Sequence, residues 1–162
     1  APVFGGVYKL AAVEDEQGNI IPKIKISENT AKITNPHYKK LYRFYDNESG
    51  KALADELCVY DETIDSTKPH TIFDPDAIWK TKTLTDYTVK ELHVTVFKNG
   101  ELVYKQPSLF EIKRYCAEQT ETLWDEVKRF ENPHTYYVDL SKKLWDIKNA
   151  LLEKSKDGKD LK

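Results

Sequence analysis

Residues 92–109 read LHVTVFKNGELVYKQPSL, and this stretch decides the fold class because two kinds of local structure meet in it. Leu92–Lys98 and Glu101–Lys105 flank the dipeptide Asn99-Gly100. These two residue types adopt the positive φ angles of a type I′ turn at low cost. The stretch therefore predicts a β-hairpin that ends shortly before Pro107.

The pattern after Pro107 becomes helical. Ser108 is followed three residues later by Glu111, which is the spacing of a capping box at a helix start. The apolar residues that then recur at helical spacing are Ile112, Tyr115, Cys116, Leu123, Val127 and Phe130. Asn132-Pro133 should end this helix, because a proline ring cannot continue the hydrogen-bond ladder. A second amphipathic helix is predicted over about 139–154, through Leu140, Leu144, Ile147 and Leu151.

The pattern before Pro107 is mostly that of strands. Ile24 and Ile26 alternate with Lys23, Lys25 and Ser27, and a half-buried strand has this period of two. Tyr42 and Phe44 alternate in the same way with Leu41, Arg43 and Tyr45. Turn residues separate four predicted runs, which are 7–14, 20–27, 40–46 and 51–60. The predicted class is α+β, with antiparallel β-hairpins or a sheet in the first two thirds followed by two C-terminal amphipathic helices.

Composition limits the class of protein further. The chain has 162 residues, of which 40% are hydrophobic, so it can bury roughly 70% of its unfolded surface without disulfide or metal staples. No apolar run approaches the roughly 20 residues of a membrane helix, and the net charge of −2 gives no general attraction to nucleic acid. We therefore expect a soluble, cytoplasmic protein with no nucleic-acid or membrane partner. The chain contains no Met, so we expect a processed chain or a piece of a longer one.

Charge is unevenly distributed along the chain. Residues 23–43 contain six basic residues and one acidic residue, whereas residues 44–65 contain seven acidic residues and one basic residue. The first segment could hold an anion. Two solvated faces of opposite charge are the alternative interpretation, and the commoner one in proteins.

Common catalytic motifs are missing from the sequence. The six glycines form neither a dinucleotide-binding nor a P-loop motif, and the four histidines are isolated from one another and from other ligands at metal-binding spacing. Asp74-Pro75-Asp76 could present two carboxylates to a divalent ion, but the same tripeptide also favours a turn. Cys58 and Cys116 lie far apart in the sequence, so they form no paired-cysteine zinc or redox motif. Lone cysteines of this kind most often act as small apolar side chains in the core. We therefore predict no catalytic residue and no metal site within the chain.

Several longer stretches of the sequence nevertheless resemble the C-terminal part of a known family, the bacterial nicotinate phosphoribosyltransferases. These stretches are Val3–Leu10, Pro22–Asn29, Lys32–Pro36, Thr71–Pro75, Phe97–Gly100, Trp124–Arg129 and Tyr136–Ser141. They occur in the family's order and cover nearly the whole chain.

The resemblance implies a fragment of an enzyme of NAD synthesis and salvage. That family joins nicotinate to 5-phosphoribosyl-1-diphosphate, coupled to ATP hydrolysis, with ATP and Mg²⁺ used by the parent enzyme. The reaction centre would lie on an upstream barrel of the same parent chain, and the parent would form a homodimer. Residues 1–155 would then be the C-terminal α+β domain, with 1–13 as the tail of the barrel region and 156–162 as a flexible tail. The isolated fragment should be inactive and act as scaffold and interface.

The same resemblance suggests four substrate-binding residues. Lys9, next to the family's last barrel segment, could reach a phosphate or pyrophosphate oxygen, and Lys25, Lys39 and Arg43 could line the same mouth of the active site or a subunit boundary. A solvated or scaffold role for each remains the alternative. The family usually has Pro-Gly where this chain has Pro36-His37, so this turn must be remodelled or strained. A stand-alone protein-interaction module is the second hypothesis for the whole chain.

Overall fold

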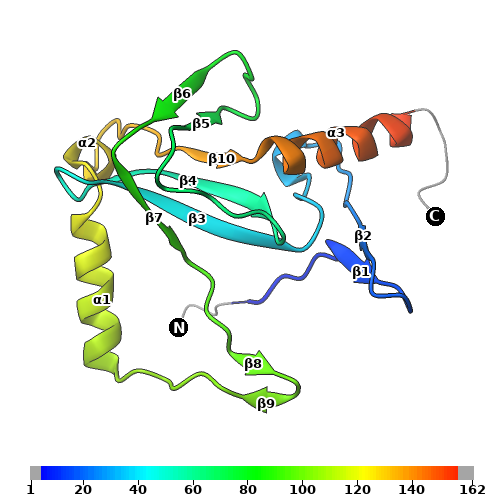
Figure 1. Ribbon diagram of the computed structural model, residues 1–162, viewed down its shortest axis with the longest axis horizontal. Helices are drawn as coiled ribbons and strands as arrows, with labels where there is room; N and C mark the ends of the chain where they lie inside the picture. Colours follow the sequence, from blue (N-terminus) through cyan, green and yellow to red (C-terminus); the bar gives the residue numbers. More distant parts are fainter. Residues whose placement is uncertain (1–4, 157–162) are drawn as a thin grey trace. The chain divides into compact units, whose positions relative to one another are not determined.

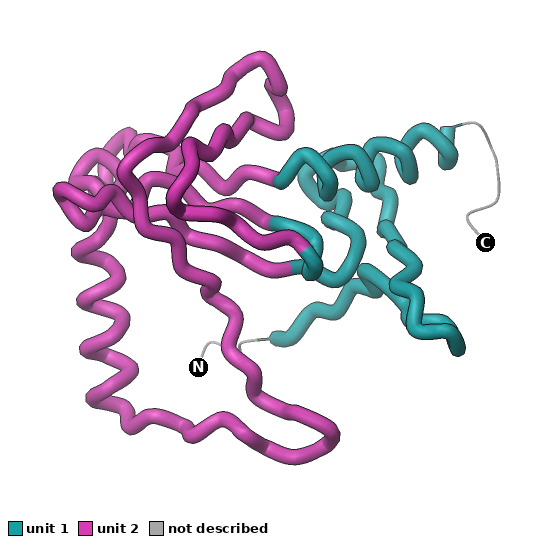
Figure 2. The backbone as a smooth tube through the Cα atoms, viewed as in Figure 1, with its two compact units in different colours: residues 1–39, 58–61, 141–162 teal, residues 40–57, 62–140 magenta. Residues whose placement is uncertain are grey.

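The computed structural model describes residues 5–156, which divide into two compact units (Figures 1 and 2). The described part of the first unit comprises residues 5–39, 58–61 and 141–156, and the second unit comprises residues 40–57 and 62–140. The expectation of a single domain over 1–155 with a barrel tail in 1–13 stays a prediction. Residues 157–162, most of the predicted flexible tail, lie outside the described residues, as do residues 1–4.

The second unit is built on a four-stranded sheet in the order β10-β4-β3-β7. Its strands are β3 (Lys39–Asp46), β4 (Ala52–Val59), β7 (Tyr87–Glu91) and β10 (Val138–Leu140). β3 and β7 are antiparallel, whereas β10 runs parallel to β4. The predicted strands over 40–46 and 51–60 are therefore confirmed, and β10, which was not predicted, completes the sheet at one edge.

One face of this sheet carries the main apolar core. Phe44 on β3 is 0% exposed and packs with Ala54 of β4 and Tyr87 of β7. The hairpin of β5 (His70–Phe73) and β6 (Thr81–Leu84) adds two further buried side chains, Ile72 and Leu84. The predicted alternation in β3 is confirmed, because Tyr42 and Phe44 are both buried.

The predicted turn at Asn99-Gly100 is present, but its strands are short. Asn99 has a φ of 51° and Gly100 a φ of 82°, and they join β8 (Phe97–Lys98) to β9 (Glu101–Leu102). Phe97 is 65% exposed, and the strands on both sides of the turn are exposed throughout. A two-stranded hairpin without a buried face is marginally stable, which explains why strand pairing stops after two residues on each side.

The predicted capping box also forms, at the start of α1 (Leu109–Glu121). The Ser108 N–H donates to the Glu111 carboxylate at 2.7 Å, and the Glu111 N–H donates back to Ser108 Oγ at 3.4 Å. The expectation that this helix continues to Asn132 is wrong, since a separate short helix, α2 (Asp125–Lys128), follows it.

Groups from outside the helix end α1 early. Lys51 Nζ donates to the carbonyl of Glu121 at 2.7 Å, and the Ala52 N–H donates to the carbonyl of Thr122 at 2.8 Å. These carbonyls would otherwise accept hydrogen bonds from the next helical turn. A tertiary contact therefore overrides the local helical period.

The first unit contains a small hairpin and the C-terminal helix. β1 (Ala12–Glu14) pairs antiparallel with β2 (Ile20–Pro22), around a turn in which Gly18 has a φ of 83°. The predicted continuation of the second strand to Ser27 is wrong. Thr34 Oγ1 accepts the Lys25 N–H at 2.9 Å, so residues 23–27 follow a loop that also contains the 3₁₀ turn η1 (Thr30–Lys32).

The C-terminal helix, α3 (Lys142–Lys156), begins three residues later than predicted because Val138–Leu140 form β10. Leu144 is its fully buried side chain, while Ile147 and Leu151 are half-buried. Within residues 5–156, none of the helices has the length and apolarity needed to span a membrane.

Candidate functional site: a lysine-lined pocket in the first unit

A pocket of about 610 Å³ lies within the first unit, between the segment before β1, the end of β2 and the last turns of α3. Four of its lining residues are lysines, and we call it the lysine pocket: Lys9, Lys23, Lys25 and Lys154. As far as the structure describes its wall, no Asp or Glu lines it. Apolar side chains such as Leu10, Ile24 and Leu151 form the rest of the wall.

Local sequence pattern brings these lysines together. Lys23 and Lys25 lie in the loop segment that begins directly after β2, and this segment lines the pocket continuously over residues 21–25. Thr34 fixes this segment, because it accepts the Lys25 N–H through Oγ1 at 2.9 Å and donates its own N–H to the Lys25 carbonyl at 3.4 Å. Lys154 lies one helical turn beyond Leu151, so α3 presents both residues to the pocket.

The chemistry of the lysine pocket is that of an anion site. Each ammonium group is a compact point charge with three donors. Four of them, with no carboxylate in the part of the wall that the structure describes, favour a ligand with several negative oxygens. Lys9 Nζ donates to the Tyr8 carbonyl at 3.2 Å, an exposed contact that leaves two of its donors for a ligand. A phosphate or diphosphate group has the matching chemistry.

Two of the four predicted substrate-binding residues, Lys9 and Lys25, therefore meet in one pocket. Two further members, Lys23 and Lys154, were not predicted. The spacing of Lys23 two residues before Lys25 is a signal that could have identified it. No signal in the sequence points to Lys154, because its place in the pocket depends on how α3 packs within the first unit.

Lys39, the third predicted residue, does not line this pocket. Its Nζ donates to the carbonyls of Asn35, Pro36 and His37 at 2.9, 3.2 and 2.6 Å. Burial lowers the pKa of this ammonium group below its ordinary value. All three donors are occupied within the chain, so Lys39 closes the loop over residues 35–39 in this structure.

The sequence predicted that the turn at Pro36-His37 is either remodelled or strained, and the structure shows strain. His37 has a φ of 78°, a region that costs a residue other than Gly of order 1 kcal/mol or more. Its Nδ1 accepts the Tyr38 N–H at 3.0 Å, and its ring stacks on Tyr60 with the centroids 5.9 Å apart. Together with the hydrogen bond from Lys39 to the His37 carbonyl, these contacts hold the turn.

Arg43, the fourth predicted residue, belongs to the second unit and forms an ion pair in which Asp55 is buried and the Arg43 side chain is 20% exposed. Its Nε and Nη2 donate to the two carboxylate oxygens of Asp55 at 2.7 and 2.8 Å. The Tyr136 hydroxyl donates to the same carboxylate at 2.9 Å, and its ring lies 5.8 Å from the guanidinium. The hydrogen bond to Asp55 raises the pKa of Arg43, and burial raises the pKa of Tyr136.

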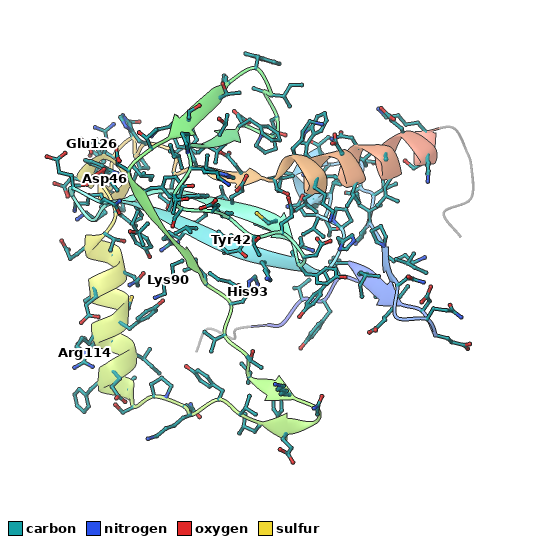
Figure 3. All side chains as sticks on the ribbon, viewed as in Figure 1. Tyr42, Asp46, Lys90, His93, Arg114 and Glu126 are labelled. Atoms are coloured by element: carbon teal, nitrogen blue, oxygen red, sulfur yellow. The ribbon has the colours of Figure 1, made fainter. Side chains whose placement is uncertain are left out.

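The histidines and the Asp74-Pro75-Asp76 segment have local roles. His70 Nε2 lies 2.7 Å from a Glu56 carboxylate oxygen, and His93 Nδ1 accepts the Leu41 N–H at 3.0 Å just beyond β7 (Figure 3). The Asp74 carboxylate accepts the Asp76 N–H at 2.9 Å, a hydrogen bond that is typical of a turn and supports the turn interpretation of this segment. Within residues 5–156, no group of three His, Cys, Asp or Glu side chains is arranged to hold a metal ion.

Comparison with known proteins connects the chain to one family. The family described as "Nicotinate phosphoribosyltransferase C-terminal domain" matches residues 38–148. Nicotinate phosphoribosyltransferase of Bacillus subtilis is 37% identical over 147 residues, which are 91% of this chain and 30% of that protein. The human enzyme of the same name is 29% identical over 150 residues, which are 93% of this chain and 27% of that protein.

A solved structure agrees with these matches. The crystal structure of human nicotinic acid phosphoribosyltransferase superposes with a TM-score of 0.66 and 25% sequence identity, over 74% of this chain and 24% of that chain. The chain thus spans 30% or less of the length of these relatives.

Proposed function

Because the chain belongs to the nicotinate phosphoribosyltransferase C-terminal domain family, we propose that it serves as the C-terminal region of an enzyme of NAD biosynthesis. That enzyme joins nicotinate to 5-phosphoribosyl-1-diphosphate and forms nicotinate mononucleotide and pyrophosphate, coupled to ATP hydrolysis in the cytoplasm. The observation that carries the proposal is the family match over residues 38–148 together with the 30% of the Bacillus subtilis relative that the chain covers.

ATP and Mg²⁺ belong to the rest of the enzyme in this proposal. The described residues offer no set of three metal-ligating side chains, and the sequence contains no P-loop. We therefore assign no step of ATP chemistry to this chain. Its own contribution is to support the reaction centre and to contact other parts of the enzyme.

Exposed apolar side chains in the second unit support the role as an interface. They follow one another from the end of β7 through the β8–β9 hairpin into α1, and we call them the hairpin–helix surface: Val94, Phe97, Leu102, Leu109, Phe110 and Tyr115. Large apolar side chains gathered on a protein surface mark interaction sites. We assign the hairpin–helix surface to contact with the proposed barrel of the same enzyme, for which the additional length of the relatives leaves room. Assembly of the whole enzyme into a homodimer is part of the same proposal.

The lysine pocket supports a direct contribution to substrate binding. Lys9 and Lys25, with Lys23 and Lys154, form a site for phosphate or diphosphate oxygens, which the substrate and the product of this reaction both carry. Lys39 and Arg43 contribute indirectly, because each holds the backbone or a neighbouring strand in place through its own hydrogen bonds.

The experiment that tests the proposal is a chimera. The C-terminal 30% of the Bacillus subtilis relative is replaced by this chain, and formation of nicotinate mononucleotide from nicotinate, 5-phosphoribosyl-1-diphosphate and ATP is measured. We expect turnover by the chimera and none by the 162-residue chain alone. Turnover by the chain alone would refute the proposal that the reaction centre lies in the rest of the enzyme. An inactive but folded chimera would favour the alternative, a stand-alone interaction module, for which the hairpin–helix surface is also suited.

A binding experiment tests the lysine pocket separately. Pyrophosphate should bind the 162-residue chain, and Lys9→Ala or Lys25→Ala should each weaken binding about fivefold, because partly exposed ion pairs contribute about 1 kcal/mol. Isothermal titration at low ionic strength measures the effect, which salt should reduce. Lys98→Ala, in the exposed β8–β9 hairpin, is the control and should bind like the unmodified chain. Equal pyrophosphate affinity of all four proteins would mean that Lys9 and Lys25 are solvated surface lysines that do not bind the ligand.

A further inference from the structure

Asp139, in the second unit, has little exposed surface, and its carboxylate forms no ion pair or hydrogen bond with the described residues. It lies on β10, is 3% exposed, and lines a cavity of about 100 Å³ together with Asp74, Lys82 and Tyr137. Within residues 5–156, no hydrogen bond or ion pair reaches its carboxylate. Among the described residues, no fully enclosed side-chain oxygen lacks a hydrogen bond, so the unpaired Asp139 oxygens are open to this cavity and a ligand there can reach them.

The neighbouring buried carboxylates show what Asp139 lacks. Asp55 and Glu56 are consecutive on β4, and successive side chains of a strand point to opposite faces of the sheet. Asp55 is held on one face by the Arg43 guanidinium, and Glu56 is held on the other by His70. Asp139 is the register partner of Glu56 and shares its face, but no cation of the described residues forms an ion pair with it.

The surroundings of Asp139 are unfavourable for an isolated negative charge. Burial raises its pKa to about 6, with further contributions from the charges of Asp74 and Glu56. At neutral pH the group is still mostly ionised. Lys80 also lines the cavity, but its Nζ is directed to Asp74 at 3.9 Å, and neither Lys80 nor Lys82 forms an ion pair with Asp139.

We propose that the cavity beside Asp139 binds a guanidinium group supplied from outside the described chain. Its volume of about 100 Å³ accommodates a group of about four heavy atoms, given that an engineered cavity of roughly 150 Å³ holds benzene. A guanidinium donates two parallel hydrogen bonds to one carboxylate and stacks on aromatic rings, and the wall contains Phe73 and Tyr137. This inference is independent of the proposed enzymatic function.

The probe is guanidinium chloride at millimolar concentrations, far below its denaturing range, with urea as an uncharged probe of the same shape. Shifts of the backbone amides of β10 in ¹⁵N–¹H spectra report binding. We expect saturable shifts with guanidinium and at least tenfold weaker binding of urea. Asp139→Asn should weaken guanidinium binding at least tenfold, whereas Asp76→Asn, an exposed carboxylate in the loop between β5 and β6, should leave it within twofold.

The pH dependence provides a second readout. Guanidinium affinity should fall toward tenfold per pH unit below about pH 6, where Asp139 takes up a proton. The charged groups around it are Asp74, Lys80 and Lys82 from the β5–β6 hairpin, His70 from β5 and Glu56 from β4. Because protonation of Asp74 or Glu56 would also weaken binding, the pH profile of Asp139→Asn must be flat for the assignment to hold.

Three results would overturn the proposal: equal affinity for urea and guanidinium, retained binding in Asp139→Asn, or no binding to the unmodified chain. If Lys82 itself supplies the cation in solution, the unmodified chain will not bind guanidinium and Lys82→Ala will, which also overturns it. N-acetylarginine amide separates two sources of the group. Binding of this capped arginine indicates a side chain of another polypeptide segment, whereas binding of the free ion alone indicates a small guanidino solute.

Discussion

Arg43→Met should lower the free energy of unfolding by up to about 3–5 kcal/mol, because removal of the arginine leaves the buried Asp55 carboxylate without its cation. The partner that remains is Asp55, which is 5% exposed and would keep only the Tyr136 hydroxyl as a side-chain donor among the contacts seen here. Urea unfolding followed by circular dichroism measures the change. The comparison holds if the variant and the unmodified chain have the same m value, which is the slope of the free energy of unfolding against urea concentration.

Two controls separate the ion pair from a general effect of losing an arginine. Arg114→Met removes an exposed arginine, 72% accessible and 3.7 Å from Glu118, and should change stability very little. The double variant Arg43→Met/Asp55→Leu should recover at least half of the loss, since an apolar pair often replaces a buried ion pair without cost. If Arg43→Met were as stable as Arg114→Met, Arg43 would be available for the substrate role that the family resemblance suggested.

The features that sequence predicted well depend on residues close together in the chain. The turn at Asn99-Gly100 and the capping box of Ser108 and Glu111 each need only a few consecutive residues. The strand β3 was predictable because its alternating pattern matches one buried face, on which Phe44 lies. Local chemistry is sufficient in all three cases.

The features that sequence missed depend on distant partners. β10 has only three residues and becomes a strand because it pairs with β4, far earlier in the chain. The end of α1 at Glu121 depends on Lys51, and the loop after β2 depends on Thr34. No local pattern encodes these contacts, so helix length and strand length were overestimated there.

The same distinction applies to the candidate site. Lys9 and Lys25 were identified through family resemblance, and the fold brings them into one pocket. Lys154 joins them only through the packing of α3. Arg43 shows the reverse case, because its basic side chain suggested a ligand contact while its actual partner, Asp55, lies on the neighbouring strand.

Leu144→Ala should lower the free energy of unfolding by about 2–5 kcal/mol, because it opens a cavity at a fully buried position of the first unit. Leu144 is 0% exposed, and its N–H is held by Ser141 Oγ at 3.2 Å, so the first turn of α3 has little freedom to collapse into the space. Leu109→Ala, at a helix position that is 76% exposed, is the matched control and should unfold near the unmodified chain. Thermal and urea unfolding of both variants measure the difference. A Leu144→Ala variant as stable as the control would mean that α3 is not packed through this side chain, and that Lys154 is then not held at the lysine pocket by the helix that carries it.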